Sequence, residues 1–421
     1  MLSQETLPAA AQRRIPMPAS LNETPSGERV HIGLFGCRNA GKSSLINALT
    51  GQDLAIVSDF KGTTTDPVSK AMEILPLGPV LLTDTPGMDD DSDLGQSRIE
   101  KARLVLRSTD VALLVVDAAQ GLNPFDQKLL TEIQARKIPY IVVFNKIDLA
   151  PSFALPQDLQ TVALAVSAQE KLHITELKER LAALAGKTEH KRPLILDLLQ
   201  PGDLTVLVVP VDGSAPKGRL ILPQQQTIRE LLDGHCTALV TQPEELPSLL
   251  KALGSTVKLV VTDSQVFHIV NKMVPPEIPL TSFSILFARY KGQLGPFIEG
   301  AVELGKLKDG DKVLISEGCT HHRQCNDIGA VKMPNWIRKF SGAQPEFIFS
   351  SGKSFPDLLH EVQLVVHCGG CMLNPQEVAY RQQTAREQHV PMTNYGIAIA
   401  YMNGILPRVL APFPQYLEKI Q

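Results

Sequence analysis

The chain has 421 residues, of which 20% are charged and 43% are hydrophobic, and its net charge is −3. This length exceeds what a single hydrophobic core usually supports, so we expect two or three domains. The sequence has neither an apolar stretch of the ~18 residues needed to cross a bilayer nor a long basic run. These features exclude a membrane span and argue against a dedicated nucleic-acid-binding protein.

Residues 1–28 are predicted to form a disordered tail. They are rich in Ala, Pro, Ser and Glu and lack the apolar core of a signal peptide. No apolar segment follows Arg13-Arg14, as a twin-arginine signal would require. Six cysteines, three of them closely patterned, indicate metal binding in a reducing compartment rather than disulfides, so we expect a cytoplasmic protein.

Residues 29–186 alternate short apolar runs with helical stretches. This pattern predicts an α/β domain with a doubly wound, mostly parallel sheet that carries helices on both faces. The apolar runs expected to form buried strands are residues 30–35, 80–83, 111–116, 140–144 and 162–166.

A phosphate-binding (P-loop) motif follows the first apolar run. The segment Gly36-Cys37-Arg38-Asn39-Ala40-Gly41-Lys42-Ser43 matches Gly-x4-Gly-Lys-Ser between a strand and a helix. In such a loop, backbone N–H groups surround a β-phosphate. We expect Lys42 to be catalytic by neutralising the β- and γ-phosphates, and Ser43 to bind magnesium. The other predicted nucleotide contacts here are Gly36, Asn39, Ala40, Gly41 and Ser44.

Two further loops are predicted to meet magnesium and the γ-phosphate. Asp84 follows the second apolar run, where its carboxylate can approach the metal. Gly87 lies three residues later in the same Asp-Thr-Pro-Gly segment, beside the γ-phosphate, and is a second catalytic candidate. The polar loop at residues 62–66 contains threonines that can contact both the metal and the γ-phosphate.

Residues at the ends of later strands predict that the base is guanine. In Asn145-Lys146-Ile147-Asp148, the Asp148 carboxylate can accept hydrogen bonds from the guanine N1–H and exocyclic amine, a donor pair that adenine lacks. Ser167-Ala168 completes the base pocket. Five elements in this order, each at the carboxyl end of a strand, predict a P-loop GTPase domain.

Two smaller α/β domains are expected after a charged linker at residues 187–193. The first of them, residues 190–264, carries no catalytic motif, which suits a structural or pairing role. Its predicted strands are residues 204–209, 236–241 and 257–262. A Pro-rich hinge at residues 274–279 lies near the start of the last unit, residues 266–421.

The last unit carries two segments with metal-ligating side chains, Cys319-Thr320-His321 and His367-Cys368-Gly369-Gly370-Cys371. Each follows a predicted strand, so folding can bring the thiols of Cys319, Cys368 and Cys371 together. Asn374-Pro375 then reads as the N-cap and first turn of a helix, whose positive end favours thiolates.

This set of side chains fits two metal centres. Zinc would be held by three cysteines and one histidine, whereas a 4Fe-4S cluster would take three cysteines and leave one iron with a weaker ligand. His321 and His367 are each either a direct ligand or a non-ligand, which would donate a hydrogen bond to the ligands or simply lie on the surface. Glu317 and Asp327 are carboxylate alternatives for the labile position. Three cysteines are predicted to be non-ligands: Cys37, Cys236 and Cys325.

The nucleotide motifs resemble those of TrmE/Era-type GTPases. In those enzymes the loop threonine beside a Thr-Asp pair binds magnesium, and this residue corresponds to Thr64, a third catalytic candidate. Met88 stands where Ras-like enzymes carry a water-orienting Gln, so we expect slow hydrolysis. Asn39 matches the asparagine that coordinates an activating potassium ion. The alternative is that Asn39 only forms the turn.

The cysteine and histidine pattern resembles the signature of the iron-iron hydrogenase maturation GTPases, the HydF family. The resemblance runs from about residue 30 to the end of the chain. It implies a GTPase domain (29–186), a dimerisation domain (190–264) and a domain that binds a 4Fe-4S cluster (266–421). It further implies a homodimeric scaffold or carrier, which receives a di-iron precursor from radical-SAM maturases and delivers it to the hydrogenase apoprotein.

Two other functional classes fit some of these motifs. One is a ribosome- or RNA-associated GTPase with a zinc-stabilised C-terminal domain, which the low aromatic content of 5% and the lack of a basic stripe disfavour. The other is a redox- or metal-sensing regulator that uses GTP as its switch. Iron and sulfide in protein purified without oxygen would separate the cluster-binding class from a zinc protein.

Overall fold

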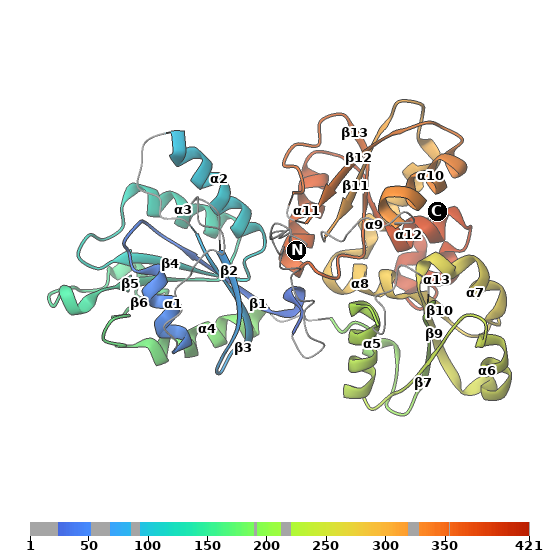
Figure 1. The fold of residues 1–421 in the computed structure, drawn as a ribbon, viewed down its shortest axis with the longest axis horizontal. Coiled ribbons are helices and arrows are strands. Elements are labelled where there is room, and N and C mark those ends of the chain that lie inside the picture. The colour runs from blue at the N-terminus through green and yellow to red at the C-terminus, as the bar shows by residue number, and fades with distance from the viewer. Residues whose placement is uncertain are drawn as a thin grey trace, which may run out of the picture.

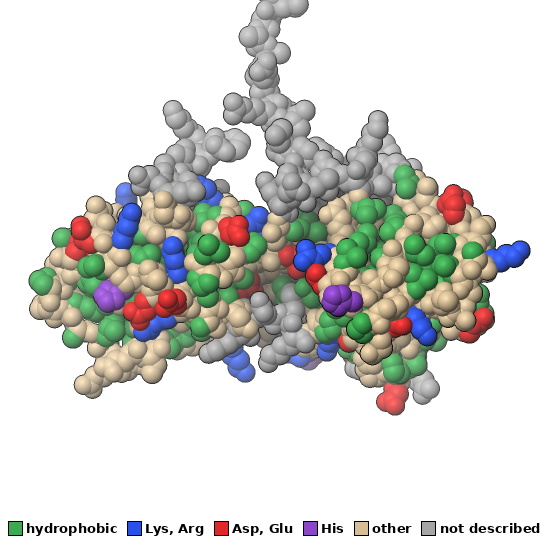
Figure 2. Space-filling view, turned by 90° about the horizontal axis from the view of Figure 1, so that it is seen from below, with side chains coloured by type: hydrophobic (Ala, Val, Ile, Leu, Met, Phe, Trp, Pro, Cys, Tyr) green, Lys and Arg blue, Asp and Glu red, His purple; other side chains and the backbone are tan. Residues whose placement is uncertain are grey.

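The structure, a computed structural model, has two lobes (Figure 1). The first lobe extends to residue 188, and the second lobe begins at residue 192. The residues that the structure describes are 24–51, 68–85, 93–188, 192–211, 220–318, 328–352 and 354–420. Basic and acidic side chains are interspersed on the face drawn in Figure 2. Among the described residues, no helix combines the length and the apolar character needed to cross a membrane.

The first lobe is built on a six-stranded sheet in the order β2-β3-β1-β4-β5-β6. Its strands are β1 (Val30–Phe35), β2 (Val68–Ile74), β3 (Gly78–Asp84), β4 (Val111–Asp117), β5 (Tyr140–Asn145) and β6 (Ala163–Ala165). Its helices are α1 (Lys42–Thr50), α2 (Asp93–Arg107), α3 (Pro124–Ala135) and α4 (Ile174–Thr188). Strand β2 runs antiparallel to β3, and the other pairings are parallel.

Helices cover both faces of this sheet because its central strands are apolar on both sides. In β4 the six residues from Val111 to Val116 are buried. One hydrophobic cluster joins the sheet to α1 and α4, and a second cluster joins the opposite face to α2 and α3. The predicted doubly wound sheet is therefore confirmed. The edge strand β2 was not predicted, because its first six residues alternate between partly buried and exposed and only Ile74 is buried.

The second lobe contains two four-stranded parallel sheets. The second sheet has the order β10-β9-β7-β8 and the third sheet the order β12-β11-β13-β14. The strands of the second sheet are β7 (Leu204–Val208), β8 (Thr237–Thr241), β9 (Val257–Thr262) and β10 (Leu280–Ser282). Its helices are α5 (Leu222–Asp233), α6 (Leu246–Leu253), α7 (Phe267–Met273) and α8 (Phe283–Lys291).

The third sheet lies nearest the first lobe (Figure 1). Its strands are β11 (Lys312–Glu317), β12 (Glu346–Ser351), β13 (Val362–His367) and β14 (Met392–Asn394). The helices of this part are α9 (Leu294–Val302), α10 (Met333–Ser341), α11 (Pro375–Glu387), α12 (Tyr395–Met402) and α13 (Leu406–Leu410). Two smaller α/β units thus follow the first lobe, as predicted.

The second sheet continues beyond residue 266, the predicted start of the last unit. Strand β10 pairs with β9, and the Pro-rich segment 274–279 connects α7 to β10 within this sheet rather than joining two domains. One hydrophobic core includes residues of both sheets, from Leu194 to Phe413. The second and third sheets therefore pack as one lobe.

Candidate nucleotide site and cysteine loop

The phosphate-binding loop connects β1 to α1 in a tight turn. Its backbone is left-handed at Asn39 and Gly41, where φ is 62° and 90°. A Cβ atom at Gly36 would lie 2.1 Å from the carbonyl oxygen of Val115, so only glycine fits there. The turn leads directly into the N-terminus of α1, whose first N–H groups lack intrahelical partners and suit an anion.

Two of the predicted magnesium ligands, Ser43 and Asp84, lie together beside this loop. Lys42 is buried, and its Nζ donates to the carbonyl oxygens of Gly36 and Cys37 at 2.8 Å each. Ser43 Oγ donates to Asp84 Oδ2 at 3.3 Å. The other carboxylate oxygen, Asp84 Oδ1, is buried and has no hydrogen-bond partner among the described residues. Burial raises the pKa of Asp84, and Lys42 and Ser43 oppose that rise. A hard divalent cation suits this donor set.

Asn145 links the phosphate loop to the predicted base pocket. Its Nδ2 donates to the carbonyl oxygen of Ala40 at 3.0 Å, and its Oδ1 accepts the N–H of Ala168 at 3.0 Å. Lys146 Nζ donates to Asp117 Oδ2 at 2.8 Å. Asp117 was not predicted as a site residue, although it ends β4 directly opposite Asn145 in β5, and that position was the available signal.

The other predicted nucleotide contacts have different surroundings. Ser44 and Asp148 are exposed, whereas Ser167 is buried and its Oγ accepts the N–H of Glu170 at 3.0 Å. Three predicted residues, Thr64, Gly87 and Met88, lie outside the described residues.

The second candidate site lies where β11 and β13, neighbours in the third sheet, end. We call residues 368–373, between β13 and α11, the cysteine loop. Cys368 Sγ accepts the N–H of Gly318 at 3.0 Å and the N–H of Gly370 at 3.3 Å. Gly318 directly precedes Cys319 in the chain. Cys319 and His321 themselves lie outside the described residues.

Burial raises the pKa of both thiols in the cysteine loop. It raises the pKa of Cys371 to about 11. The neighbouring Cys368 also raises this pKa, whereas the positive charge of Lys291 lowers it. For Cys368, the N–H groups of Gly318 and Gly370 oppose the rise in pKa. A bound metal would supply the positive charge that stabilises two thiolates here. Within the described part of the chain, His, Cys, Asp and Glu side chains form no group of three that could hold a metal.

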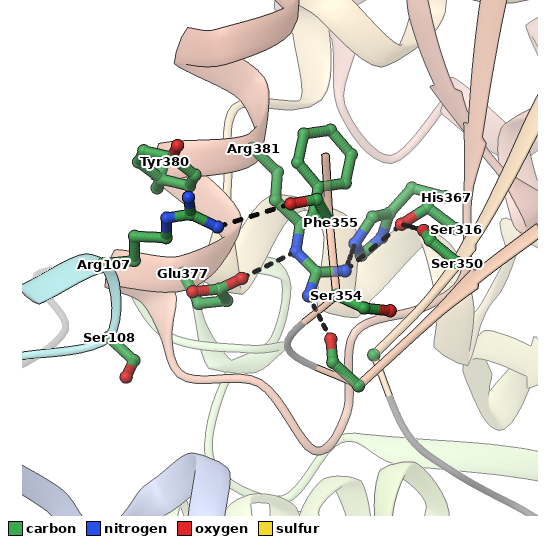
Figure 3. A network of polar contacts seen from close by, with 12 residues as sticks. Arg107, Ser108, Ser316, Ser350, Ser354, Phe355, His367, Glu377, Tyr380 and Arg381 are labelled. Carbon is green, nitrogen blue, oxygen red and sulfur yellow. Dashed lines mark hydrogen bonds and ion pairs between the residues drawn. The ribbon is translucent and has the colours of Figure 1, made fainter. Parts of the chain in front are cut away.

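Both ring nitrogens of His367 are hydrogen-bonded, and one of these bonds holds the cysteine loop. Buried Arg381 donates from Nη1 to His367 Nε2 at 3.2 Å (Figure 3). Nδ1 of His367 therefore carries the proton and donates to the carbonyl oxygen of Cys368 at 2.7 Å. Burial and the charge of Arg381 lower the pKa of His367 to about 3. This geometry favours the orienting role for His367 over direct metal ligation.

Arg381 is itself fixed from several sides. Its Nε donates to Glu377 Oε1 at 2.9 Å, and its Nη1 donates to Ser316 Oγ at 3.3 Å. Its guanidinium lies 5.3 Å from the centre of the Phe355 ring. No sequence motif marks Arg381. Only its position on α11, where it contacts Ser316 in β11 and His367 in β13, identifies it.

Two other cysteines have neighbours away from the cysteine loop. Cys236 Sγ donates to the carbonyl oxygen of Gln200 at 3.3 Å, next to the second sheet. Cys37 Sγ accepts from Asn123 Nδ2 at 2.8 Å in the first lobe. That these two cysteines are not ligands stays a prediction, and Cys325 lies outside the described residues.

The fold of the first lobe and its loops define a P-loop GTPase joined to two further α/β units. Residues 31–146 match the family model described as a 50S ribosome-binding GTPase. Residues 194–292 match the family model of the hydrogen maturase F dimerization domain. Residues 295–412 match the family model of the hydrogen maturase F tetramerization domain. The chain belongs to the hydrogen maturase F (HydF) family, and its GTPase domain is of the TrmE/Era type, as the sequence predicted.

Individual relatives share the GTPase part of the chain. The tRNA modification GTPase MnmE of Bordetella petrii is 39% identical over 160 residues, which are 38% of this chain and 34% of that protein. MnmE of Nitrosomonas europaea is 40% identical over 124 residues, covering 29% of this chain and 27% of that protein. The chain thus spans about a third of the length of the curated relatives it matches.

Among solved structures, an Era variant from Aquifex aeolicus bound to GDP.AlF4- is 20% identical to this chain. That match covers 54% of this chain and 98% of the other, with a TM-score of 0.31.

Proposed function

We propose that this protein is a GTP-hydrolysing scaffold or carrier that binds a 4Fe-4S cluster. In this role it assembles or delivers the di-iron precursor of the hydrogenase active-site cluster to the hydrogenase apoprotein, after receiving it from radical-SAM maturases. The observation that supports this most is that the ends of β11 and β13 lie close together, where the N–H of Gly318 donates to Cys368 Sγ. The two hydrogen maturase F segments further support an oligomer, for which we propose a homodimer as the basic unit.

The proposed cluster site uses three sulfurs from two loops. Cys319, Cys368 and Cys371 would hold three irons of a 4Fe-4S cluster, and the fourth iron would keep an exchangeable ligand. That open position is the chemistry a carrier needs. His321 is the histidine that remains a candidate for it, because the ring nitrogens of His367 are already hydrogen-bonded.

The proposed GTP site assigns a role to each predicted residue. Ser43, Thr64 and Asp84 would hold magnesium, and Lys42 and Gly87 would contact the terminal phosphates. Asp148 would select guanine, and the other predicted contacts complete the pocket. These are Gly36, Asn39, Ala40, Gly41, Ser44, Asn145, Lys146, Ser167 and Ala168. Without a water-orienting Gln at the position of Met88, hydrolysis would be slow.

The metal content of protein purified without oxygen tests this proposal. We expect iron and sulfide in equal amounts, a brown colour and broad absorption near ~400 nm. Protein without iron and sulfide, or a colourless protein with zinc at full occupancy, would contradict the proposal. A full zinc site would instead favour the ribosome- or RNA-associated GTPase.

Asn39 is expected to make GTP hydrolysis depend on potassium. We expect turnover on the order of tenfold faster in potassium than in sodium buffer, because a cation on the β/γ bridge stabilises the transition state as an arginine finger does. In an Asn39→Gly variant the two rates should become equal. Glycine keeps the left-handed φ of 62° but removes the side-chain oxygen. If the variant retains potassium stimulation, or if the natural protein shows none, Asn39 only forms the turn.

A further inference from the structure

The first contact that ties the end of the cysteine loop to the first lobe is made by Asn374, the residue that directly follows the loop. This residue is 1% exposed and caps α11, since its Oδ1 accepts the N–H of Glu377 at 3.2 Å. Its Nδ2 donates across the lobe boundary to the carbonyl oxygen of Ser108 at 2.9 Å. The same Nδ2 lies 3.3 and 3.2 Å from the two carboxylate oxygens of Asp110. The helix cap therefore uses only the Oδ1 atom of Asn374, and the Nδ2 amide group makes the contact between the lobes.

Lys291 makes the second contact and joins three parts of the chain. It ends α8, is 3% exposed, and its Nζ donates to the carbonyl oxygens of Cys371 at 3.0 Å and Leu373 at 2.7 Å. The counter-ion of the Lys291 ammonium is Glu28 of the first lobe, whose Oε1 lies 3.0 Å from Nζ. A buried ammonium without its counter-ion is strongly destabilising, so this ion pair ties the loop to the first lobe.

The backbones of the two lobes also meet at this point. A Cβ atom on Gly27 would lie 2.7 Å from the carbonyl oxygen of Leu373 and 2.9 Å from that of Cys371. Only a residue without a side chain fits against the cysteine loop here. The segment at Gly27 and Glu28 immediately precedes β1.

The two first-lobe partners of Asn374, Ser108 and Asp110, lie next to elements that lead toward the nucleotide site. Asp110 Oδ2 accepts the N–H of His31 at 2.9 Å, and His31 lies in β1, which runs into the phosphate-binding loop. Ser108 follows α2, the helix that begins shortly after Gly87, the predicted γ-phosphate contact. Segments that contact the γ-phosphate commonly rearrange when the nucleotide changes.

The end of α2 provides a parallel connection. Arg107 donates to the carbonyl oxygen of Phe355 at 3.3 Å and forms an ion pair with Asp357. Its guanidinium lies 4.7 Å from the centre of the Tyr380 ring on α11 (Figure 3). The ring of Phe355 in turn packs against Arg381, the residue that holds His367.

We infer that Asn374 and Lys291 are positioning residues through which the first lobe holds the cysteine loop, so that the nucleotide state of the first lobe changes the mobility of Cys371. This inference deepens the proposed function and rests on its GTP-binding part. It does not require that the cluster be present.

Hydrogen exchange in the full chain tests the inference. The natural protein, reduced and without metal, would be compared with GDP and with a non-hydrolysable GTP analogue, each with magnesium. We expect exchange in peptides covering residues 368–374 to differ by at least about fivefold between the two nucleotides, the lower end of the range for coupled sites. Equal exchange with both nucleotides bound would overturn the inference.

Two variants test the two contacts separately. Asn374→Ser keeps an N-cap oxygen but loses the amide N–H groups, and Glu28→Gln removes the counter-ion of Lys291. We expect each to reduce the nucleotide-dependent difference, while nucleotide affinity and GTP hydrolysis stay unchanged. If both variants behave as the natural protein does, the inference is wrong. Thermal unfolding checks each variant, and either variant carries the test if the other does not fold.

Asn394→Ser is the matched control. Asn394 is also 1% exposed and also caps a helix, α12, by accepting the N–H of Ile397 at 2.9 Å. Its Nδ2, however, donates to the carbonyl oxygen of Ser284 at 3.1 Å, within the second lobe. This variant should keep the nucleotide-dependent difference. Iron and sulfide measured separately after reconstitution show whether cluster binding fails on its own.

Discussion

A Cys368→Ser variant is expected to lose its iron and sulfide while hydrolysing GTP at a rate within about twofold of the natural protein. Serine has nearly the same shape, and its hydroxyl can still accept the N–H groups that Gly318 and Gly370 donate to Cys368 Sγ. The loop should therefore keep its conformation. A serine oxygen does not replace a thiolate on iron, so the loss reports the ligand rather than the fold.

Iron and sulfide assays together with the absorption near ~400 nm measure this loss, and phosphate release measures hydrolysis. Cys236→Ser is the control, because Cys236 is a buried thiol beside the second sheet. That variant should keep its iron. Full iron content in the Cys368→Ser variant would remove this residue from the cluster site.

The opposite pattern is expected for Lys42→Ala, which should lose GTP hydrolysis by a factor on the order of 10²–10³ and keep its iron. Lys42 is held at the phosphate loop by the carbonyl oxygens of Gly36 and Cys37, from where its ammonium can turn to the β- and γ-phosphates. Truncation to alanine removes that positive charge, and no other cation in the phosphate-binding motif stands at this position.

Phosphate release under saturating GTP measures the effect, and a fluorescent GDP analogue separates lost binding from lost turnover. Lys128→Ala is a suitable control, because Lys128 is an exposed lysine on α3 of the same lobe. Turnover close to that of the natural protein in the Lys42→Ala variant would contradict the assignment of the nucleotide site.

The parts of the fold that follow from local sequence were predictable. β4 is apolar on both faces, which marks a buried parallel strand without knowledge of its neighbours. The tight glycine turn at Gly36 and the N-cap at Asn374 are also local, and the structure has both. β2 was missed because an edge strand with alternate coverage gives a weaker pattern than a continuous apolar run.

The contacts around the cysteine loop were not predictable, because their partners lie far apart in the chain. Asn374 meets Ser108 across 266 positions, and Arg107 meets Phe355 across 248. The sequence could therefore name the thiols but not the residues that hold them. It left two roles open for His367, and only the position of Arg381 on α11 favours one of them.

The core shared by the second and third sheets has a practical consequence for dissecting this protein into fragments. The two hydrogen maturase F segments meet between residues 292 and 295. Truncating the chain there would uncover Phe283, Phe287 and Phe297, each at most 1% exposed, at about 1.5–3 kcal/mol per side chain. Recombinant fragments that end or begin at that point should aggregate. A break between residues 188 and 192 instead leaves the hydrophobic cores of both lobes intact.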